Sequence, residues 1–192
     1  MNEKEQKITV SDRILAATFL KLLPARVTPN HLTIFRFIMV PVVAFAVFLE
    51  LYPLSVILFI VAAFTDALDG ALARTRNQIT DWGKMYDPMA DKLLIGLVAI
   101  LLIPRFMSFG IAFMIILIEM MLIGSAYYLK HRRGKEIRAN AWGKTKMILQ
   151  STGVAALLLF AISGIPFFYP IALYALYGAI VFGAVSILTY SI

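Results

Sequence analysis

Six long apolar stretches alternate with short polar connections along the 192-residue chain. They fall at residues 32–50, 54–72, 89–104, 108–129, 147–164 and 167–190. About 20 residues of apolar helix are needed to cross the hydrocarbon core of a bilayer, and most of these stretches approach that length. The pattern therefore predicts an all-α integral membrane protein, with six transmembrane helices in a domain of residues 31–192.

A shorter amphipathic segment precedes the first of these stretches. Apolar residues recur at helical spacing in Ser11–Leu23, and Pro24 ends the pattern. Because this segment is too short to cross a bilayer, we expect an N-terminal interfacial helix that lies on the membrane surface, within a cytoplasmic segment of residues 1–30. Packing against another subunit is the alternative interpretation of the same apolar face.

The composition supports a membrane protein. Hydrophobic residues make up 61% of the chain and charged residues 15%, with a mean hydropathy of +0.85. Soluble domains have about 45–50% apolar and about 25% charged residues. These values exclude a disordered chain and argue against a soluble globule. The chain has no cysteine, which excludes disulfides, a thiol nucleophile and thiolate metal ligands.

The positive charges indicate an orientation in the membrane. The formal net charge is +7, and every lysine and arginine except Arg105 lies before, or at the cytoplasmic ends of, the predicted spans. The positive-inside rule then places both termini and the connections 74–92 and 130–146 in the cytoplasm. Cations sorted to one membrane side do not form a patch for nucleic acid, so no nucleic-acid partner is expected.

The most informative polar segment, Thr65–Lys92, joins the second and third apolar stretches. Asp66 and Asp69 are three positions apart and Asp87 and Asp91 four apart, so on helices each pair shares one face. A tight hairpin would bring the four carboxylates together, where their repulsion requires cations or protons. Hard divalent ions prefer carboxylate oxygens, and two such ions can bind a phosphoryl group during its transfer.

Residues between the aspartates suit a diphosphate ligand. Gly70 and Gly83 allow the backbone to approach a ligand closely, and Ala73 leaves its helix face uncrowded. Arg74, one turn beyond Asp69, is a bidentate phosphate donor. Together with the aspartates these residues predict a metal–diphosphate site.

Two other interpretations of the aspartates remain open at this point. They could form structural ion pairs with the neighbouring cations Arg74, Arg76, Lys84 and Lys92. They could also form the ion site of a cation transporter. A pathway across the membrane would be expected to leave further acidic steps, and Glu119 is the one acidic residue well inside a later stretch.

The pattern of the polar segment resembles the signature of the CDP-alcohol phosphotransferase (CDP-alcohol phosphatidyltransferase) family. It reads Asp66-x₂-Asp69-Gly70-x₂-Ala73-Arg74-x₈-Gly83-x₃-Asp87-x₃-Asp91. The resemblance implies transfer of a phosphatidyl-type group from a CDP-linked lipid to an alcohol, with release of CMP. It implies two divalent cations, Mg²⁺ or Mn²⁺, held by Asp66, Asp69, Asp87 and Asp91, and deprotonation of the acceptor hydroxyl by Asp91. The CDP moiety would contact Asp69, Gly70, Ala73, Arg74 and Gly83. Asn30 and Thr33 would contact the nucleotide or cap the first helix.

Two stretches resemble the phosphatidylglycerophosphate synthase branch of this family. Residues 87–92 read DPMADK, a form that also resembles CDP-dependent cardiolipin synthases. Residues 137–146 read IRANAWGKTK, and this resemblance implies glycerol 3-phosphate as the acceptor. Lys144 and Lys146 would contact its phosphate, or serve only the orientation of the chain. Those enzymes often carry an Arg-Glu pair in the fourth span, whereas here Ile118 precedes Glu119.

Other acceptors, such as inositol phosphate or phosphatidylglycerol, and a catalytically silent assembly partner remain alternatives. The resemblance also implies a homodimer in the cell membrane, with its active site facing the cytoplasm.

Overall fold

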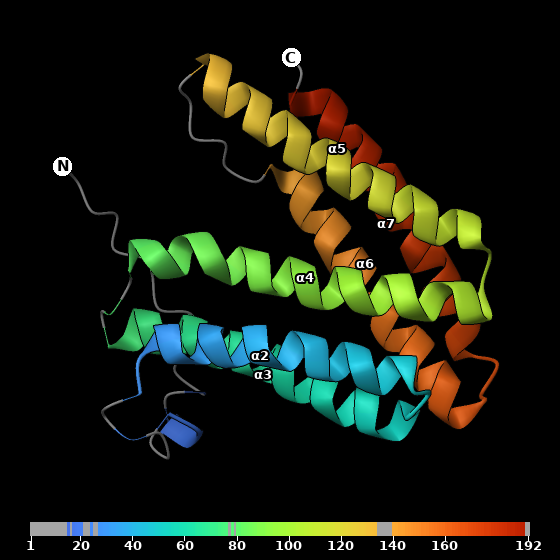
Figure 1. The fold of residues 1–192 in the computed structure, drawn as a ribbon, viewed down its shortest axis with the longest axis horizontal. Coiled ribbons are helices and arrows are strands. Elements are labelled where there is room, and N and C mark those ends of the chain that lie inside the picture. Colours follow the sequence, from blue (N-terminus) through green and yellow to red (C-terminus); the bar gives the residue numbers. More distant parts are fainter. Residues whose placement is uncertain are drawn as a thin grey trace. The chain divides into compact units, whose positions relative to one another are not determined.

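The computed structural model describes residues 15, 17–20, 24, 27–76, 78, 80–133 and 140–190. These residues form helices and connections, and no strand occurs among them. The helices, which Figure 1 labels in chain order, are α2 (Pro29–Phe48), α3 (Tyr52–Thr75), α4 (Asp81–Phe106), α5 (Phe109–Arg133), α6 (Ala141–Ser163) and α7 (Phe168–Tyr190). Each predicted apolar stretch corresponds to one of them, so the all-α prediction is confirmed.

Four helices, α2, α3, α6 and α7, are long and apolar enough to cross a membrane. The chain is therefore a multi-pass membrane protein. The apolar part of α5 is shorter, Phe109–Ser125. In α4 the first turns are polar, because Asp87, Asp91 and Lys92 precede its apolar half.

Most of the predicted N-terminal helix lies outside the described residues. Of Ser11–Leu23, the structure describes Leu15 and residues 17–20, where the Phe19 amide donates to the Leu15 carbonyl at 3.0 Å, as in a helix. Leu20 packs in an apolar cluster with Leu68 and Leu72 of α3. This contact places Leu20 against the second half of α3.

The chain divides into two compact units. The first contains Met1–Leu49 and Ile57–Leu94, and therefore α2, most of α3 and the beginning of α4. The second contains Glu50–Val56 and Ile95–Ile192, and therefore the rest of α4 with α5, α6 and α7. All four aspartates of the predicted site belong to the first unit, whereas Lys144 and Lys146 belong to the second.

In the first unit, α2 presents one face to the interior. Thr28 begins the helix with a capping box that involves His31, and Pro29 occupies the first turn. The buried positions then include Thr33, Arg36 and Val43, which recur at the helical spacing of one face. Two polar side chains therefore lie on the buried face of an otherwise apolar helix.

In the second unit, α7 packs against α5 and α6. Gly153 of α6 permits a close approach, because a Cβ there would lie 2.7 Å from Cγ of Leu176. A short turn separates the helices of the last two apolar stretches. Gly164 follows α6 with φ 63°, a left-handed conformation that glycine adopts without strain, and α7 begins at Phe168.

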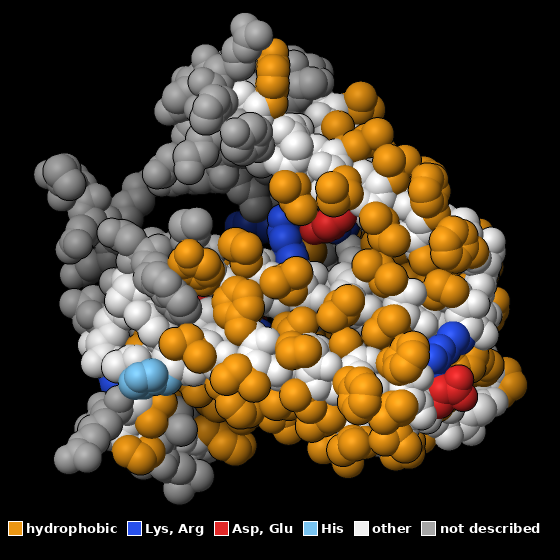
Figure 2. All heavy atoms as spheres, in the orientation of Figure 1, with side chains coloured by type: hydrophobic (Ala, Val, Ile, Leu, Met, Phe, Trp, Pro, Cys, Tyr) orange, Lys and Arg blue, Asp and Glu red, His pale blue; other side chains and the backbone are white. Residues whose placement is uncertain are grey.

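Large apolar side chains cover much of the surface. Figure 2 shows them spread over the visible face, with few charged side chains among them. Ile57 is 60% exposed and Tyr174 is 74% exposed. Exposed apolar area on this scale is typical of a surface that contacts lipid rather than water.

Candidate active site

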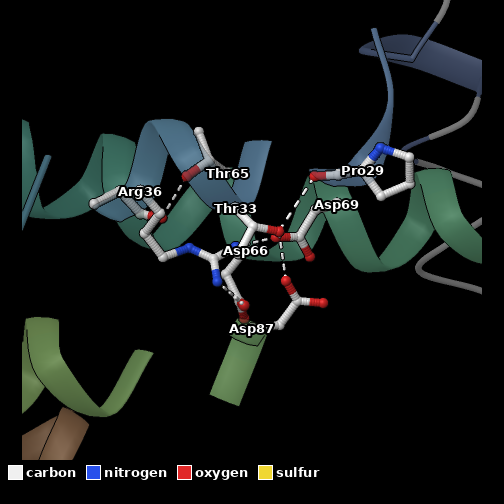
Figure 3. Close-up of polar contacts among 8 residues, drawn as sticks. Pro29, Thr33, Arg36, Thr65, Asp66, Asp69 and Asp87 are labelled. Atoms are coloured by element: carbon white, nitrogen blue, oxygen red, sulfur yellow. Dashed lines mark hydrogen bonds and ion pairs between the residues drawn. The ribbon is translucent and has the colours of Figure 1, made fainter. Parts of the chain in front are cut away.

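The first unit brings together polar side chains from three helices. Thr33 and Arg36 come from α2, Asp66 and Asp69 from α3, and Asp87 from the beginning of α4 (Figure 3). Asp66 and Asp69 both contact Arg36, as expected of two residues that share one face of a helix. The two α2 residues that join them were not predicted as partners.

Arg36 forms ion pairs with two of the aspartates. Its Nη1 lies 2.8 Å from Asp66 Oδ1, and its Nη2 donates a hydrogen bond to Asp69 Oδ2. The Arg36 side chain is fully buried and that of Asp69 is 4% exposed, whereas that of Asp66 is 46% exposed. One guanidinium therefore compensates a buried carboxylate and one that is open to solvent.

Thr33 connects α2 to α4. Its buried hydroxyl lies 2.5 Å from Asp87 Oδ1 and 3.3 Å from the carbonyl oxygen of Pro29. Figure 3 shows this hydroxyl between the two oxygens. The structure thus gives Thr33 a definite role in holding Asp87, while its predicted contact with the nucleotide stays a prediction.

Thr80 links the beginning of α4 to Asn30, and sequence reasoning missed it. The Gly83 amide donates to Thr80 Oγ1 at 3.0 Å, which is the bond of an N-cap threonine. The same hydroxyl donates to Asn30 Oδ1 at 2.8 Å. The sequence offered one indication of this cap, namely a threonine three residues before Gly83 at the start of the polar helix.

Gly83 has little room for a side chain. A Cβ there would lie 3.2 Å from Thr80 Oγ1, 3.4 Å from Asp87 Oδ2 and 3.5 Å from Asn30 Oδ1. The predicted close approach at this glycine is therefore made by the protein's own polar atoms. Gly83 places the α4 backbone where Asn30 and Asp87 converge.

Gly70 and Arg74 lie together on α3. The Arg74 guanidinium covers Gly70, since a Cβ at Gly70 would lie 3.2 Å from Arg74 Nη2. Ala73 is partly buried on the same helix. The predicted contacts of these three residues with CDP stay predictions.

Asp91 lies one turn beyond Asp87 on α4. It is partly buried, and the charges of Asp66 and Arg36 act on it. Asp91 therefore belongs to the same electrostatic cluster as the other three aspartates.

The donor set suits hard divalent cations, because carboxylate oxygens are the ligands that Mg²⁺ and Mn²⁺ prefer. Among the described residues, however, no group of three or more His, Asp or Glu side chains is arranged to hold a metal ion. Instead Asp66 and Asp69 contact Arg36, and Asp87 contacts Thr33. The chemistry of the residues fits the ions, and the metal assignment stays a prediction.

The second unit contains the lysines predicted to contact the acceptor. Lys146 is 2% exposed, and its Nζ forms an ion pair with the Glu119 carboxylate, whereas Lys144 is exposed. Gly183 of α7 lies beside this pair and permits a close approach of α5, because a Cβ there would lie 2.5 Å from Cγ2 of Ile118 and in ordinary contact, 3.5 Å, with Lys146 Cγ. Glu119, the acidic residue well inside a later apolar stretch, therefore has a charged partner.

Comparison with known proteins shows similarity along most of the chain. Residues 26–187 match the profile of the CDP-alcohol phosphatidyltransferase family. A protein of Rickettsia felis is 34% identical over 134 residues, which cover 68% of this chain and 74% of that protein. A protein of Bacillus subtilis is 39% identical over 136 residues, which cover 68% of this chain and 67% of that protein. Both relatives bear the name CDP-diacylglycerol–glycerol-3-phosphate 3-phosphatidyltransferase.

Proposed function

Because the chain belongs to the CDP-alcohol phosphatidyltransferase family, we propose that it transfers a phosphatidyl group from CDP-diacylglycerol to glycerol 3-phosphate and releases CMP. The observation that carries this proposal is the polar cluster of the first unit, in which the family signature meets Thr33 and Arg36 of α2. The names of the relatives support the donor and the acceptor.

The proposed reaction uses Asp91 as the base. Asp91 accepts the proton of the acceptor hydroxyl, whose oxygen attacks the β-phosphorus of the CDP-lipid. A new phosphorus–oxygen bond forms, the bond to CMP breaks, and CMP leaves with the electron pair. A positioned base typically raises such a rate by about 10²–10⁴-fold. Asp91 is partly buried on α4, and the charges of Asp66 and Arg36 act on it. This environment is consistent with the role of a base.

Two divalent cations, Mg²⁺ or Mn²⁺, would be held by Asp66, Asp69, Asp87 and Asp91. When bound, they would neutralise the diphosphate and make CMP a better leaving group. Thr33 then orients Asp87 through its hydroxyl, and Thr80 fixes the beginning of the helix that carries Asp87 and Asp91.

The CDP moiety would contact residues on both sides of the aspartates. Arg74 has the planar, bidentate donor geometry that phosphate oxygens favour, and its guanidinium lies over Gly70, which has no side chain to displace it. Asn30 and Gly83 meet at the beginning of α4 and would contribute a polar edge for the nucleotide. Ala73 and Asp69 complete the proposed CDP contacts on α3.

The acceptor phosphate would be bound by cations of the second unit. Lys144 is exposed and therefore available to a soluble phosphate. Lys146 is already neutralised by Glu119 and almost fully buried, so we propose that it supports the beginning of α6 and contributes less to the acceptor.

In the membrane, we propose that α4 and α5 also span the bilayer, which gives six spans with both termini in the cytoplasm. The distribution of lysine and arginine supports this orientation, with Arg105 at the opposite end. There Arg105 Nη1 lies 3.4 Å from Glu50 Oε1, which compensates its charge. The enzyme would reside in the cell membrane as a homodimer, with its active site facing the cytoplasm.

A CMP-release assay with the purified full chain tests the proposal. With CDP-diacylglycerol and Mg²⁺, glycerol 3-phosphate should release CMP faster than inositol 1-phosphate, serine or phosphatidylglycerol. Asp91→Asn should abolish release while the protein remains folded. Glu50→Gln, which neutralises a 65% exposed carboxylate outside the signature, should leave the rate unchanged. A faster rate with another member of the panel would refute the assignment of the acceptor.

A further inference from the structure

Arg36 is unusual for its place in the molecule. It is a fully buried cation on an apolar helix, and it reaches two carboxylates of the neighbouring helix α3. The family signature, which begins at Asp66, does not include it. A single ionised side chain inside a membrane protein generally needs a charged or polar partner, and functional roles are common among such residues.

The contacts of Arg36 use atoms that a metal ion would also need. Asp66 Oδ1 lies 2.8 Å from Nη1, and Asp69 Oδ2 accepts a hydrogen bond from Nη2. Asp69 is almost fully buried, so without a cation its carboxylate would carry an uncompensated charge in the interior. The guanidinium therefore does in this structure what a divalent cation would do in the metal-bound enzyme.

We propose that Arg36 is the internal counter-ion of Asp66 and Asp69 in the metal-free protein, and that it competes with divalent cations for these two carboxylates. This inference rests on the proposed metal site. Two consequences follow from electrostatics. Removing Arg36 takes one positive charge away from the place where divalent cations would bind, so metal affinity rises. It also leaves the buried Asp69 carboxylate of the metal-free protein without the guanidinium that compensates its charge, so the stability of the metal-free protein falls.

The opposite sign would identify a different role. If Arg36 served to orient the carboxylates for the metal, its removal would weaken metal binding, because flexible ligands bind less tightly. A purely structural Arg36 would change stability with and without metal by the same amount. Metal affinity therefore separates the three roles without any measurement of activity.

The experiment compares the full-length wild-type protein with Arg36→Met in detergent micelles. Free Mn²⁺ is measured by electron paramagnetic resonance during titration, and thermal unfolding is followed with and without Mn²⁺. We expect Arg36→Met to bind Mn²⁺ about tenfold more tightly. Its unfolding temperature should be lower than that of the wild type without metal, and Mn²⁺ should raise it by more.

Two further variants keep the test decisive. Arg36→Lys retains the charge but loses the bidentate donor, so its Mn²⁺ affinity should lie between those of the wild type and Arg36→Met. If Arg36→Met does not fold, Arg36→Lys alone is compared with the wild type. Arg105→Met removes a cation of the second unit that lies 3.4 Å from Glu50, and it should leave Mn²⁺ affinity unchanged.

Equal or weaker Mn²⁺ binding by Arg36→Met, or by Arg36→Lys if it alone folds, overturns the proposed competition. A wild-type protein that binds no Mn²⁺ and gains no stability from it instead refutes the metal site itself. The two failures are therefore distinguishable.

Discussion

Replacement of Thr33 by valine tests the link between α2 and the aspartate cluster. Valine has nearly the shape of threonine, so Thr33→Val creates no cavity at this fully buried position. It removes the hydroxyl that lies 2.5 Å from Asp87 Oδ1 and 3.3 Å from the Pro29 carbonyl. The effect on stability therefore reports mainly the lost hydrogen bond.

The expected magnitude follows from the burial of the two partners. A hydrogen bond to a charged group contributes about 1.5–3 kcal/mol to stability. Because Asp87 is only partly buried, water can replace part of the lost bond, and we expect a loss of about 1–2 kcal/mol. For a chain of this size, each kcal/mol lowers the unfolding temperature by about 2–4 °C.

Two assays on the same preparation measure the result. Thermal unfolding in detergent gives the loss of stability, and CMP release gives the loss of activity, which should be about tenfold because Asp87 is less firmly held. Thr33→Ser keeps the hydroxyl and should retain most of the activity. Thr152→Val, at an exposed position of α6, should change the unfolding temperature little. A Thr33→Val protein with wild-type stability and wild-type CMP release would refute the role of this hydroxyl.

Three further predictions concern other contacts. Gly83→Ala should leave stability nearly unchanged, because the gain of about 1 kcal/mol from the higher helix propensity of alanine is offset by the 3.2 Å contact with Thr80 Oγ1. CMP release should fall, and an unchanged rate would contradict the close packing at Gly83. Glu119→Gln should cost about 3 kcal/mol in chemical unfolding because it removes the negative charge that pairs with the buried Lys146, and adding Lys146→Met should restore most of this loss. Equal losses in the single and double variants would argue against the ion pair. Chelation with EDTA should stop CMP release and added Mg²⁺ or Mn²⁺ should restore it, whereas activity that survives EDTA would exclude the proposed metal dependence.

The helices themselves could be predicted from sequence, because long apolar runs in a membrane leave few alternatives to helix. The ends were less accurate where polar residues continue a helix. The apolar pattern of the third stretch covers residues 89–104, whereas α4 already begins at Asp81. The first turns of α4 are polar, and Thr80 caps their N-terminal end. The apolar pattern therefore does not indicate where this helix begins.

The candidate site could be predicted only in part. Asp66 and Asp69, like Asp87 and Asp91, share helix faces, and this is a local property that spacing determines. Their partners Arg36 and Thr33 are distant in the sequence: Arg36 is 33 residues from Asp69, and Thr33 is 54 residues from Asp87. Such pairs depend on how α2 packs against α3 and α4. An arginine within the first apolar stretch was nevertheless a signal that a charged partner was needed.

The proposed reaction is tested most directly by following both products of a single incubation. The purified chain would be given CDP-diacylglycerol, Mg²⁺ and glycerol 3-phosphate labelled in its glycerol carbons. We predict that label enters the lipid fraction in equal amount to the CMP released, and that Asp91→Asn abolishes both signals together. Release of CMP without labelled lipid, or labelled lipid formed at the wild-type rate by Asp91→Asn, would contradict the proposed transfer and its base.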